Sequence, residues 1–177
     1  HKLYGVGEKR CDHFAKQCLM ARRLVERDVR AVEVTLGGWD THNNNFLSAP
    51  EKAEILDQGI SALLTDLERR GMLEQTLVVL ATEFGRTPKI NQNEGRDHYP
   101  KAFSCLMAGG GVKGGIVYGQ SDEYGILTSE DAVHTHDLHA TMLHLLGIDH
   151  ERLTFRHAGR DFRLTDVHGR VVREIIS

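Results

Sequence analysis

The chain has 177 residues, with 22 Lys or Arg against 25 Asp or Glu, and a formal net charge of −3. This length suits one domain with a full core, and the near balance of charge argues against a nucleic-acid-binding module. No apolar run approaches the roughly 20 residues that cross a bilayer, so we expect no membrane span. The chain begins at His1 without a leader pattern, which is compatible with removal of a signal or of an earlier segment.

The cysteines and histidines of the chain indicate which side chains could carry chemistry. The three cysteines, Cys11, Cys18 and Cys105, are odd in number and form no CxxC pair. This pattern favours buried thiols over a disulfide framework or a thiolate metal site. Eleven histidines in a chain of this length are unusual, and their excess indicates metal or proton chemistry.

The first part of the chain alternates helical and strand patterns. Residues 11–25 place apolar side chains at helical spacing, which predicts an amphipathic helix. Arg30–Leu36 is rich in β-branched residues and ends at two glycines, as a buried strand does when it enters a turn. After an irregular connection that includes Pro50, a second helical stripe is predicted from near Glu51 to Gly71.

The middle of the chain is predicted to contain strands. Thr76–Ala81 is a short, continuous apolar run, which is typical of a strand buried on both faces of a parallel sheet. Ala102–Ala108 is a further strand candidate, and Ile116–Tyr118 a short edge strand. The glycine run between these two lacks the spacing of a phosphate-binding loop.

A last helix, capped by Thr135 or Asp137, is predicted to end at Gly147, and residues 171–176 to form a strand or short helix. This order predicts an α/β fold with a mostly parallel sheet and helices on both faces. Acid-containing loops then follow two strands at one edge of the sheet, where ligands bind in such folds.

Five side chains near the predicted strand ends are candidates for one metal site: Asp40, His42, Glu83, Asp97 and His98. Carboxylate oxygens and neutral imidazole nitrogens are ligands that zinc, manganese and related ions prefer. A metal there would polarise an ester oxygen or lower the pKa of bound water. Arg86 offers its fork of donors to an anionic substrate group, which makes it the catalytic candidate.

Two structural alternatives stay open. An isolated Asp-x-His pair is more often used for capping and turn hydrogen bonds, and only the recurrence of acid-bearing loops favours a metal site. The histidines His134, His136 and His139 open a predicted helix, where a capping role is favoured over a second metal or a role behind metal ligands.

Longer motifs carry a family resemblance: Gly37–His42, Glu83–Pro88, Gly95–His98, Ala108–Gly115, and the stretch from His136 to Gly147. In this order they resemble the bacterial sulfatase-like family catalogued as domain of unknown function 1501, over about Tyr4 to Ile176. The resemblance implies membership in the alkaline phosphatase and sulfatase superfamily. Members of that superfamily hydrolyse or transfer phosphate and sulfate esters at one or two metals.

The resemblance assigns roles to single positions. Asp40 and His42 resemble the paired ligands of one metal, although one residue separates them here where the superfamily has three. His98 resembles the later histidine of the same site. Glu83 and Phe84 stand where the superfamily has Asp-His, so Glu83 keeps a carboxylate ligand while Phe84 cannot replace the histidine.

The superfamily's early Asp ligand and its nucleophile have no counterpart before Asp40. The resemblance therefore implies that residues 1–177 form one sulfatase-like domain, the carboxyl-terminal portion of a longer domain, with an alkaline-phosphatase-like sheet incomplete at its amino-terminal side. We expect a metal-dependent hydrolase of phosphate or sulfate esters. The alternative is a non-catalytic metal- or ligand-binding member of the fold with a structural or partner-binding role.

The same resemblance implies the partners of the chain. We expect a divalent metal as cofactor, zinc before manganese or calcium, and a small-molecule or glycan ester as substrate. Nucleic acid is not expected as a partner. Export to the periplasm is implied by the resemblance alone.

Overall fold

Helix α1 (Asp12–Val25) forms where apolar side chains recur at helical spacing. The structure is a computed structural model that describes all of residues 1–177. Phe14 and Cys18 of this helix are buried. Arg22 and Arg23 occupy the last turn, where cationic side chains complement the negative end of the helix dipole. The first predicted helix is confirmed.

Helix α2 (Asn45–Arg69) is longer than predicted, because it begins at Asn45 rather than near Glu51. Pro50 lies inside the helix and lacks the N–H that would complete one helical hydrogen bond. A tertiary contact holds the early start: the backbone N–H of Asn45 donates to the carbonyl of Glu94 at 2.9 Å. Local sequence does not reveal that contact, which explains the misplaced boundary.

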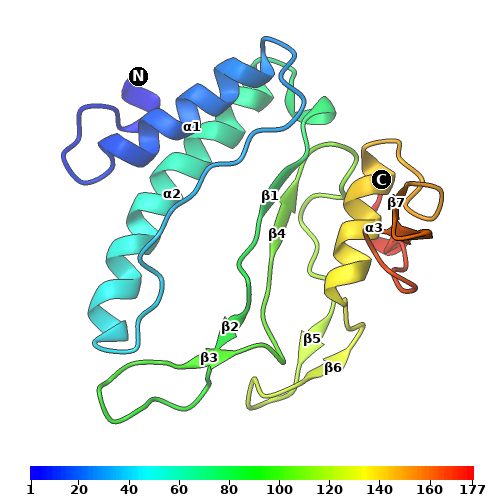
Figure 1. Ribbon diagram of the computed structural model, residues 1–177. Helices are drawn as coiled ribbons and strands as arrows, with labels where there is room; N and C mark the ends of the chain where they lie inside the picture. The colour runs from blue at the N-terminus through cyan, green and yellow to red at the C-terminus, as the bar shows by residue number, and fades with distance from the viewer. The chain divides into compact units, whose positions relative to one another are not determined.

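Helices α1 and α2 pack against each other in the first compact unit, which comprises His1–Thr76 and Glu83–Phe103 (Figure 1). Their approach is close because Gly59 lacks a side chain. A Cβ atom at this position would lie 2.5 Å from the ring of Phe14. The buried apolar side chains of α2 complete this core: Ala62, Leu63 and Leu67.

Replacing Gly59 with alanine should lower the free energy of unfolding by up to about 2 kcal/mol. The added methyl group overlaps the Phe14 ring, and overpacking costs roughly 1–3 kcal/mol, of which the higher helix propensity of alanine offsets about 1 kcal/mol. Urea denaturation measures the difference. Ser61→Ala, an exposed position in the same helix, is the control and should change stability by less than about 0.5 kcal/mol. Equal effects of the two variants would contradict the close packing.

A largely buried ion-pair network joins the start of the chain to both helices. Asp66 Oδ2 lies 2.9 Å from Arg22 Nε and accepts a hydrogen bond from the Tyr4 hydroxyl at 3.0 Å. Asp66 Oδ1 accepts from Arg70 Nε at 2.8 Å. Burial by itself would raise the pKa of Asp66, but hydrogen bonds from Arg70 and Tyr4 and the charge of Arg22 lower it overall. The ionised carboxylate therefore neutralises Arg22, whose side chain is only 7% exposed.

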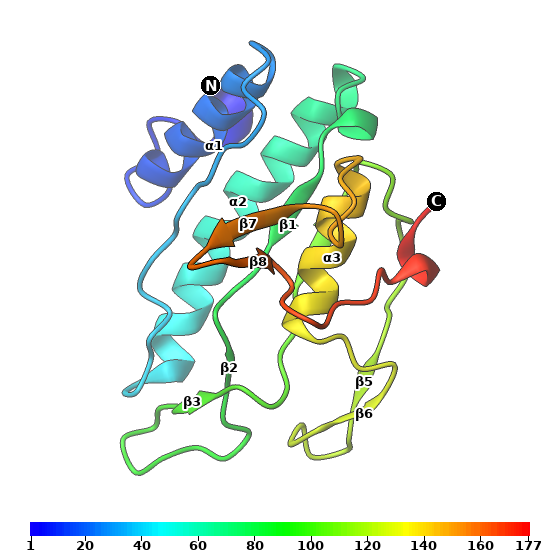
Figure 2. The ribbon, with the colours of Figure 1, turned by 45° about the vertical axis from the view of Figure 1, so that its right-hand side comes forward.

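The segment Arg30–Leu36 runs beside α2 as extended chain but forms no strand, so the strand predicted here is wrong (Figures 1 and 2). Its burial nevertheless alternates as in a strand. Val32, Val34 and Leu36 are half-buried, while the residues between them are exposed. Within the first unit, no backbone group of the segment bonds to another backbone group. The sequence pattern thus predicts the extended conformation correctly, but it does not predict whether another strand pairs with the segment.

The four sheets are antiparallel strand pairs, so the predicted mostly parallel, alkaline-phosphatase-like sheet is wrong. The strands are β1 (Val78–Leu80), β2 (Gly85–Arg86), β3 (His98–Tyr99), β4 (Leu106–Ala108), β5 (Gln120–Ser121), β6 (Thr128–Glu130), β7 (Thr154–His157) and β8 (Arg160–Arg163). The run Thr76–Ala81 yields only β1, which pairs with β4 and is half-buried. A strand of a parallel sheet would be buried on both faces. An apolar run predicts a strand, but not the direction of its neighbour.

The second compact unit comprises Leu77–Thr82 and Ser104–Ser177. Helix α3 (Thr135–Leu145) confirms the last predicted helix, but its N-cap is His134 rather than Thr135 or Asp137. The His134 side chain accepts a backbone N–H from the first turn, and Asp137 accepts the backbone N–H of His134 at 3.0 Å. The two side chains form a capping box that satisfies free donors at the helix start.

Polar side chains hold the tail of the second unit. The Thr141 hydroxyl accepts a hydrogen bond from the backbone N–H of Val172 at 2.9 Å, and both residues are buried. His150 Nδ1 lies 3.0 Å from Thr165 Oγ1, again in a buried position. The predicted terminal strand or helix is a short 3₁₀ helix. The 3₁₀ helices are η1 (Lys2–Tyr4), η2 (Leu73–Gln75) and η3 (Arg173–Ile175).

Three smaller predictions can also be compared with the structure. Cys11 and Cys18 are buried thiols as predicted, whereas Cys105 is exposed. Ile116–Tyr118 forms no edge strand, and the chain pairs instead at β5 and β6. None of the helices combines the length and apolar character that a membrane span requires.

Candidate metal centre

Asp40 and His42 lie on the loop between the extended segment and α2, on either side of a buried residue. Thr41 is only 7% exposed, its hydroxyl donates to Asn45 Oδ1 at 2.6 Å, and its carbonyl accepts the backbone N–H of Arg96 at 3.0 Å. Successive side chains of an extended chain point to opposite sides. Because Thr41 is held inward, Asp40 and His42 turn together to the other side.

A turn from residue 91 to 95 packs against this loop. Asn91 Nδ2 donates to the carbonyl of His42 at 3.0 Å, and Asn43 and Glu94 form an isolated β-bridge. Gly95 lies so close to the His42 carbonyl that a Cβ atom would have no room. Glycine is therefore required for the approach of the two segments.

His98 reaches the same place from the opposite direction. It lies on β3, where it pairs across the two strands with Arg86 of β2. Directly opposite residues of an antiparallel pair present their side chains on the same face. Gly85 allows the pair to form, since a Cβ atom there would lie 2.5 Å from the carbonyl oxygen of Ala102. The β2–β3 pair thus presents an imidazole and a guanidinium together.

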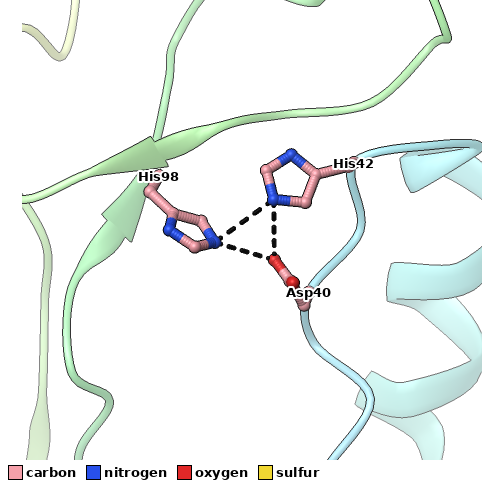
Figure 3. Close-up of side chains that lie close together, drawn as sticks. All are labelled: Asp40, His42 and His98. Carbon is pink, nitrogen blue, oxygen red and sulfur yellow. Dashed lines mark hydrogen bonds and ion pairs between the residues drawn. The ribbon is translucent and has the colours of Figure 1, made fainter.

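Three ligand atoms converge on one point (Figure 3). Asp40 Oδ1 is 3.1 Å from His42 Nε2 and 2.9 Å from His98 Nε2, and the two Nε2 atoms are 3.2 Å apart. Ligands that lie about 2.0–2.1 Å from a tetrahedral zinc ion are separated from one another by roughly 3.3 Å. The triangle therefore matches one face of a coordination shell and leaves the remaining positions open. One carboxylate and two imidazoles also form a ligand set that suits zinc.

Asp97 lies behind His42 rather than within this triangle. Its Oδ1 is 2.9 Å from His42 Nδ1 and accepts a hydrogen bond from Asn91 Nδ2 at 3.0 Å. These hydrogen bonds lower the pKa of Asp97. An ionised carboxylate at this position holds the proton on Nδ1 and leaves Nε2 free to face Asp40 and His98. The contact gives Asp97 the role of orienting His42.

Arg86 contacts the centre through Asp40. Its Nη1 donates to Asp40 Oδ1 at 2.7 Å and to the carbonyl of Arg96 at 3.4 Å. Hydrogen bonds from His98 and Arg86 lower the pKa of Asp40 to about 2. The Asp40 carboxylate is therefore ionised at neutral pH, which is the form that binds a cation.

Glu83 is exposed and lies outside the group of converging ligand atoms. Its neighbour Phe84 packs against His98 with tilted rings, whose centroids are 4.4 Å apart. Metal ligation by Glu83 or Asp97 stays a prediction. Sequence reasoning missed Asn91, because an asparagine in a polar loop carries no signal of the contacts that it makes with distant residues.

Three histidines lie at the start of α3, and one of them caps the helix. His134 caps it, and the rings of His134 and His136 lie 4.8 Å apart, while His136 and His168 stack at 5.6 Å. His139 is exposed on the helix. The ligand atoms of these residues do not converge as those of Asp40, His42 and His98 do.

Fold and site together define a protein of helices and short antiparallel strand pairs with an exposed carboxylate–imidazole group that can hold a metal ion. Residues 1–176 match the model of the family described as Protein of unknown function (DUF1501), and the chain belongs to that family. The family expected from the motifs is therefore confirmed over nearly the whole chain. No curated protein and no solved structure matches the chain.

Replacing Asp97 with asparagine should weaken zinc binding by about 10- to 100-fold, because His42 loses the carboxylate that fixes its orientation. Competition with a chromogenic chelator measures the affinity. Asp57→Asn, an exposed position on α2, removes the same charge away from the centre and serves as the control. Unchanged affinity in the Asp97 variant would show that His42 does not depend on this contact.

Proposed function

We propose that the chain binds a divalent metal, zinc before manganese or calcium, at Asp40, His42 and His98, and hydrolyses phosphate or sulfate esters there. The observation that carries the proposal is the convergence of three ligand atoms, none more than 3.2 Å from another. The motifs that resemble the alkaline phosphatase and sulfatase superfamily add support, since members of that superfamily act on these esters.

The residues around the metal site have distinct parts in this reaction. A divalent metal acts as a Lewis acid, which polarises an ester oxygen and lowers the pKa of water. Arg86 donates to Asp40 through Nη1 and presents the rest of its guanidinium fork to the anionic ester group. Asp97 keeps the proton of His42 on Nδ1, so that the other nitrogen faces the metal position.

A cavity beside the centre offers space for the alcohol part of the ester. Its volume is about 490 Å³, and its lining is polar or charged apart from one apolar residue: Thr87, Lys89, Ile90, Asn91, Gln92, Asn93 and Asp97. Amide, ammonium and carboxylate groups bind hydroxyl groups better than they bind apolar surface. This lining favours a polar small molecule or a glycan as the esterified alcohol.

Metal content and ester hydrolysis of the purified chain test the proposal together. Elemental mass spectrometry measures the bound metal, and release of nitrophenol from p-nitrophenyl phosphate or p-nitrophenyl sulfate measures turnover. We expect metal-dependent hydrolysis that is lost in His42→Ala and retained in His144→Ala, where an exposed imidazole on α3 is removed. Absence of bound metal, or equal rates in the two variants, would overturn the proposal.

The position of Phe84 favours a second candidate function without catalysis. Phe84 packs against His98 and stands at the position where the superfamily carries a ligand histidine, and so a second metal would lack this ligand. In this case the chain holds a metal or ligand for a structural or partner-binding purpose. Tight metal binding with no turnover of either ester would select this function.

A further inference from the structure

The oxygen of Asp40 that faces the two imidazoles is also the oxygen that Arg86 contacts. Asp40 Oδ1 lies 2.9 Å from His98 Nε2 and 3.1 Å from His42 Nε2 (Figure 3). The same oxygen accepts a hydrogen bond from Arg86 Nη1 at 2.7 Å. A metal held by the three ligand atoms would therefore share its carboxylate oxygen with a guanidinium.

The charges around this oxygen make the sharing unfavourable for a metal. Asp40 carries one negative charge, which Arg86 already balances, and imidazoles bind a metal in their neutral form. A divalent ion beside Asp40 adds positive charge next to a guanidinium, and like charges at short range repel each other. With the charge of Asp97 behind His42 counted as well, these residues and the ion still carry an excess positive charge.

Arg86 is held beside Asp40 by further contacts. Its side chain is only 20% exposed, and its Nη1 also donates to the carbonyl of Arg96 at 3.4 Å. Its guanidinium lies 5.9 Å from the centre of the Phe84 ring, and its backbone pairs with that of His98 between β2 and β3. These contacts fix the positive charge of Arg86 next to the position of the metal.

We propose that Arg86 makes metal binding and oxyanion binding depend on each other. Arg86 weakens metal binding while no anion is present, and an oxyanion removes this penalty by neutralising the excess positive charge. Phosphate, sulfate and their esters share the required chemistry, which is a set of negatively charged oxygen acceptors for the guanidinium. The coupling rests on the proposed function, because it needs a metal at Asp40, His42 and His98. Linkage requires that the metal strengthens anion binding by the same factor.

Zinc affinity with and without an oxyanion tests the coupling in the purified chain. Equilibrium dialysis against zinc buffers fixes the free zinc concentration, so zinc that the anion holds in solution has no effect. Elemental mass spectrometry measures the bound zinc. We expect sulfate or methylphosphonate to raise the zinc affinity by about tenfold relative to perchlorate at equal ionic strength. An unchanged affinity with both oxyanions would overturn the coupling.

Arg86→Gln tests the sign of the effect. Without an oxyanion this variant should bind zinc about tenfold more tightly than the original chain, because the competing cation is gone. The oxyanions should then raise its zinc affinity less than they raise that of the original chain. Arg10→Gln is the control, since it removes the same charge from an exposed pair with Glu54, and it should behave as the original chain does.

A role of Arg86 in positioning Asp40 alone predicts the opposite sign, since loss of the guanidinium would then lower the zinc affinity. A lower or unchanged affinity in Arg86→Gln, with circular dichroism showing a folded variant, would contradict the coupling. Two outcomes distinguish its failure from failure of the proposed function. Absence of bound zinc in every buffer would overturn both, whereas bound zinc and ester hydrolysis without any effect of the oxyanions on zinc affinity would overturn the coupling alone.

Discussion

Replacing Asp40 with alanine should lower the zinc affinity of the centre by about 100- to 500-fold. Four-ligand sites bind zinc with about 10–16 kcal/mol, or roughly 2.5–4 kcal/mol per ligand, and each 1.4 kcal/mol corresponds to about tenfold in affinity. Asp40 is also the only carboxylate among the three converging ligands. Calorimetric titration with zinc measures the effect.

Asp40→Asn separates charge from geometry. It keeps an oxygen near His42 and His98 but removes the negative charge, and its affinity should lie between those of the original chain and Asp40→Ala. Asp57→Asn again serves as the control for charge alone. If Asp40→Ala binds zinc as well as the original chain, the contacts of Asp40 with Arg86 and the imidazoles form an ion-pair network and not a metal site.

Replacing Asp66 with asparagine should lower the free energy of unfolding by about 2–3 kcal/mol, because buried Arg22 then keeps only the more exposed Glu26 as its counter-charge. Urea denaturation at pH 7 measures the loss. Glu54→Gln breaks the pair that Glu54 forms with Arg10 at 2.6 Å, in which both side chains are more than 60% exposed. This control should change stability by less than about 1 kcal/mol. Similar losses of unfolding free energy in the two variants would contradict the idea that the buried ion pair matters more than the exposed one.

The stability difference at Asp66 should depend on pH in one direction. The folded state lowers the pKa of Asp66, so the charged carboxylate stabilises the protein above the unfolded pKa of about 4. As the pH falls from there through the lower folded pKa, the carboxylate is protonated and this stabilisation is lost. The difference between Asp66→Asn and the original chain should therefore shrink below about pH 4.

The helices could be predicted from sequence because their signals are local. The apolar spacing of α1 and α3 is contained within each helix and predicts it correctly. The start of α2 was not predictable, since the bond from Asn45 to Glu94 joins distant parts of the chain. The prediction of a mostly parallel sheet was wrong for a related reason. Alternation in Arg30–Leu36 predicts extended chain, but strand formation also needs a partner that a single segment does not specify.

The candidate metal centre was predictable in its residue types but not in its geometry. Recurrent acids and histidines near strand ends, together with the family motifs, indicated Asp40, His42 and His98. The role of Asp97 depends on its contact with His42 Nδ1, across 55 positions of the chain. Asn91 likewise acts over 49 positions. Such distant contacts follow from tertiary structure and leave no periodic pattern in the sequence.

Gly95 carries no functional group, yet the arrangement of the candidate metal ligands depends on it. The carbonyl of His42 occupies the space of a side chain at this position. Even a methyl group there would push the loop of Asp40 and His42 away from the strand that carries His98. Mutational scanning should therefore find position 95 as intolerant as the ligands themselves, although its substitution removes no donor atom.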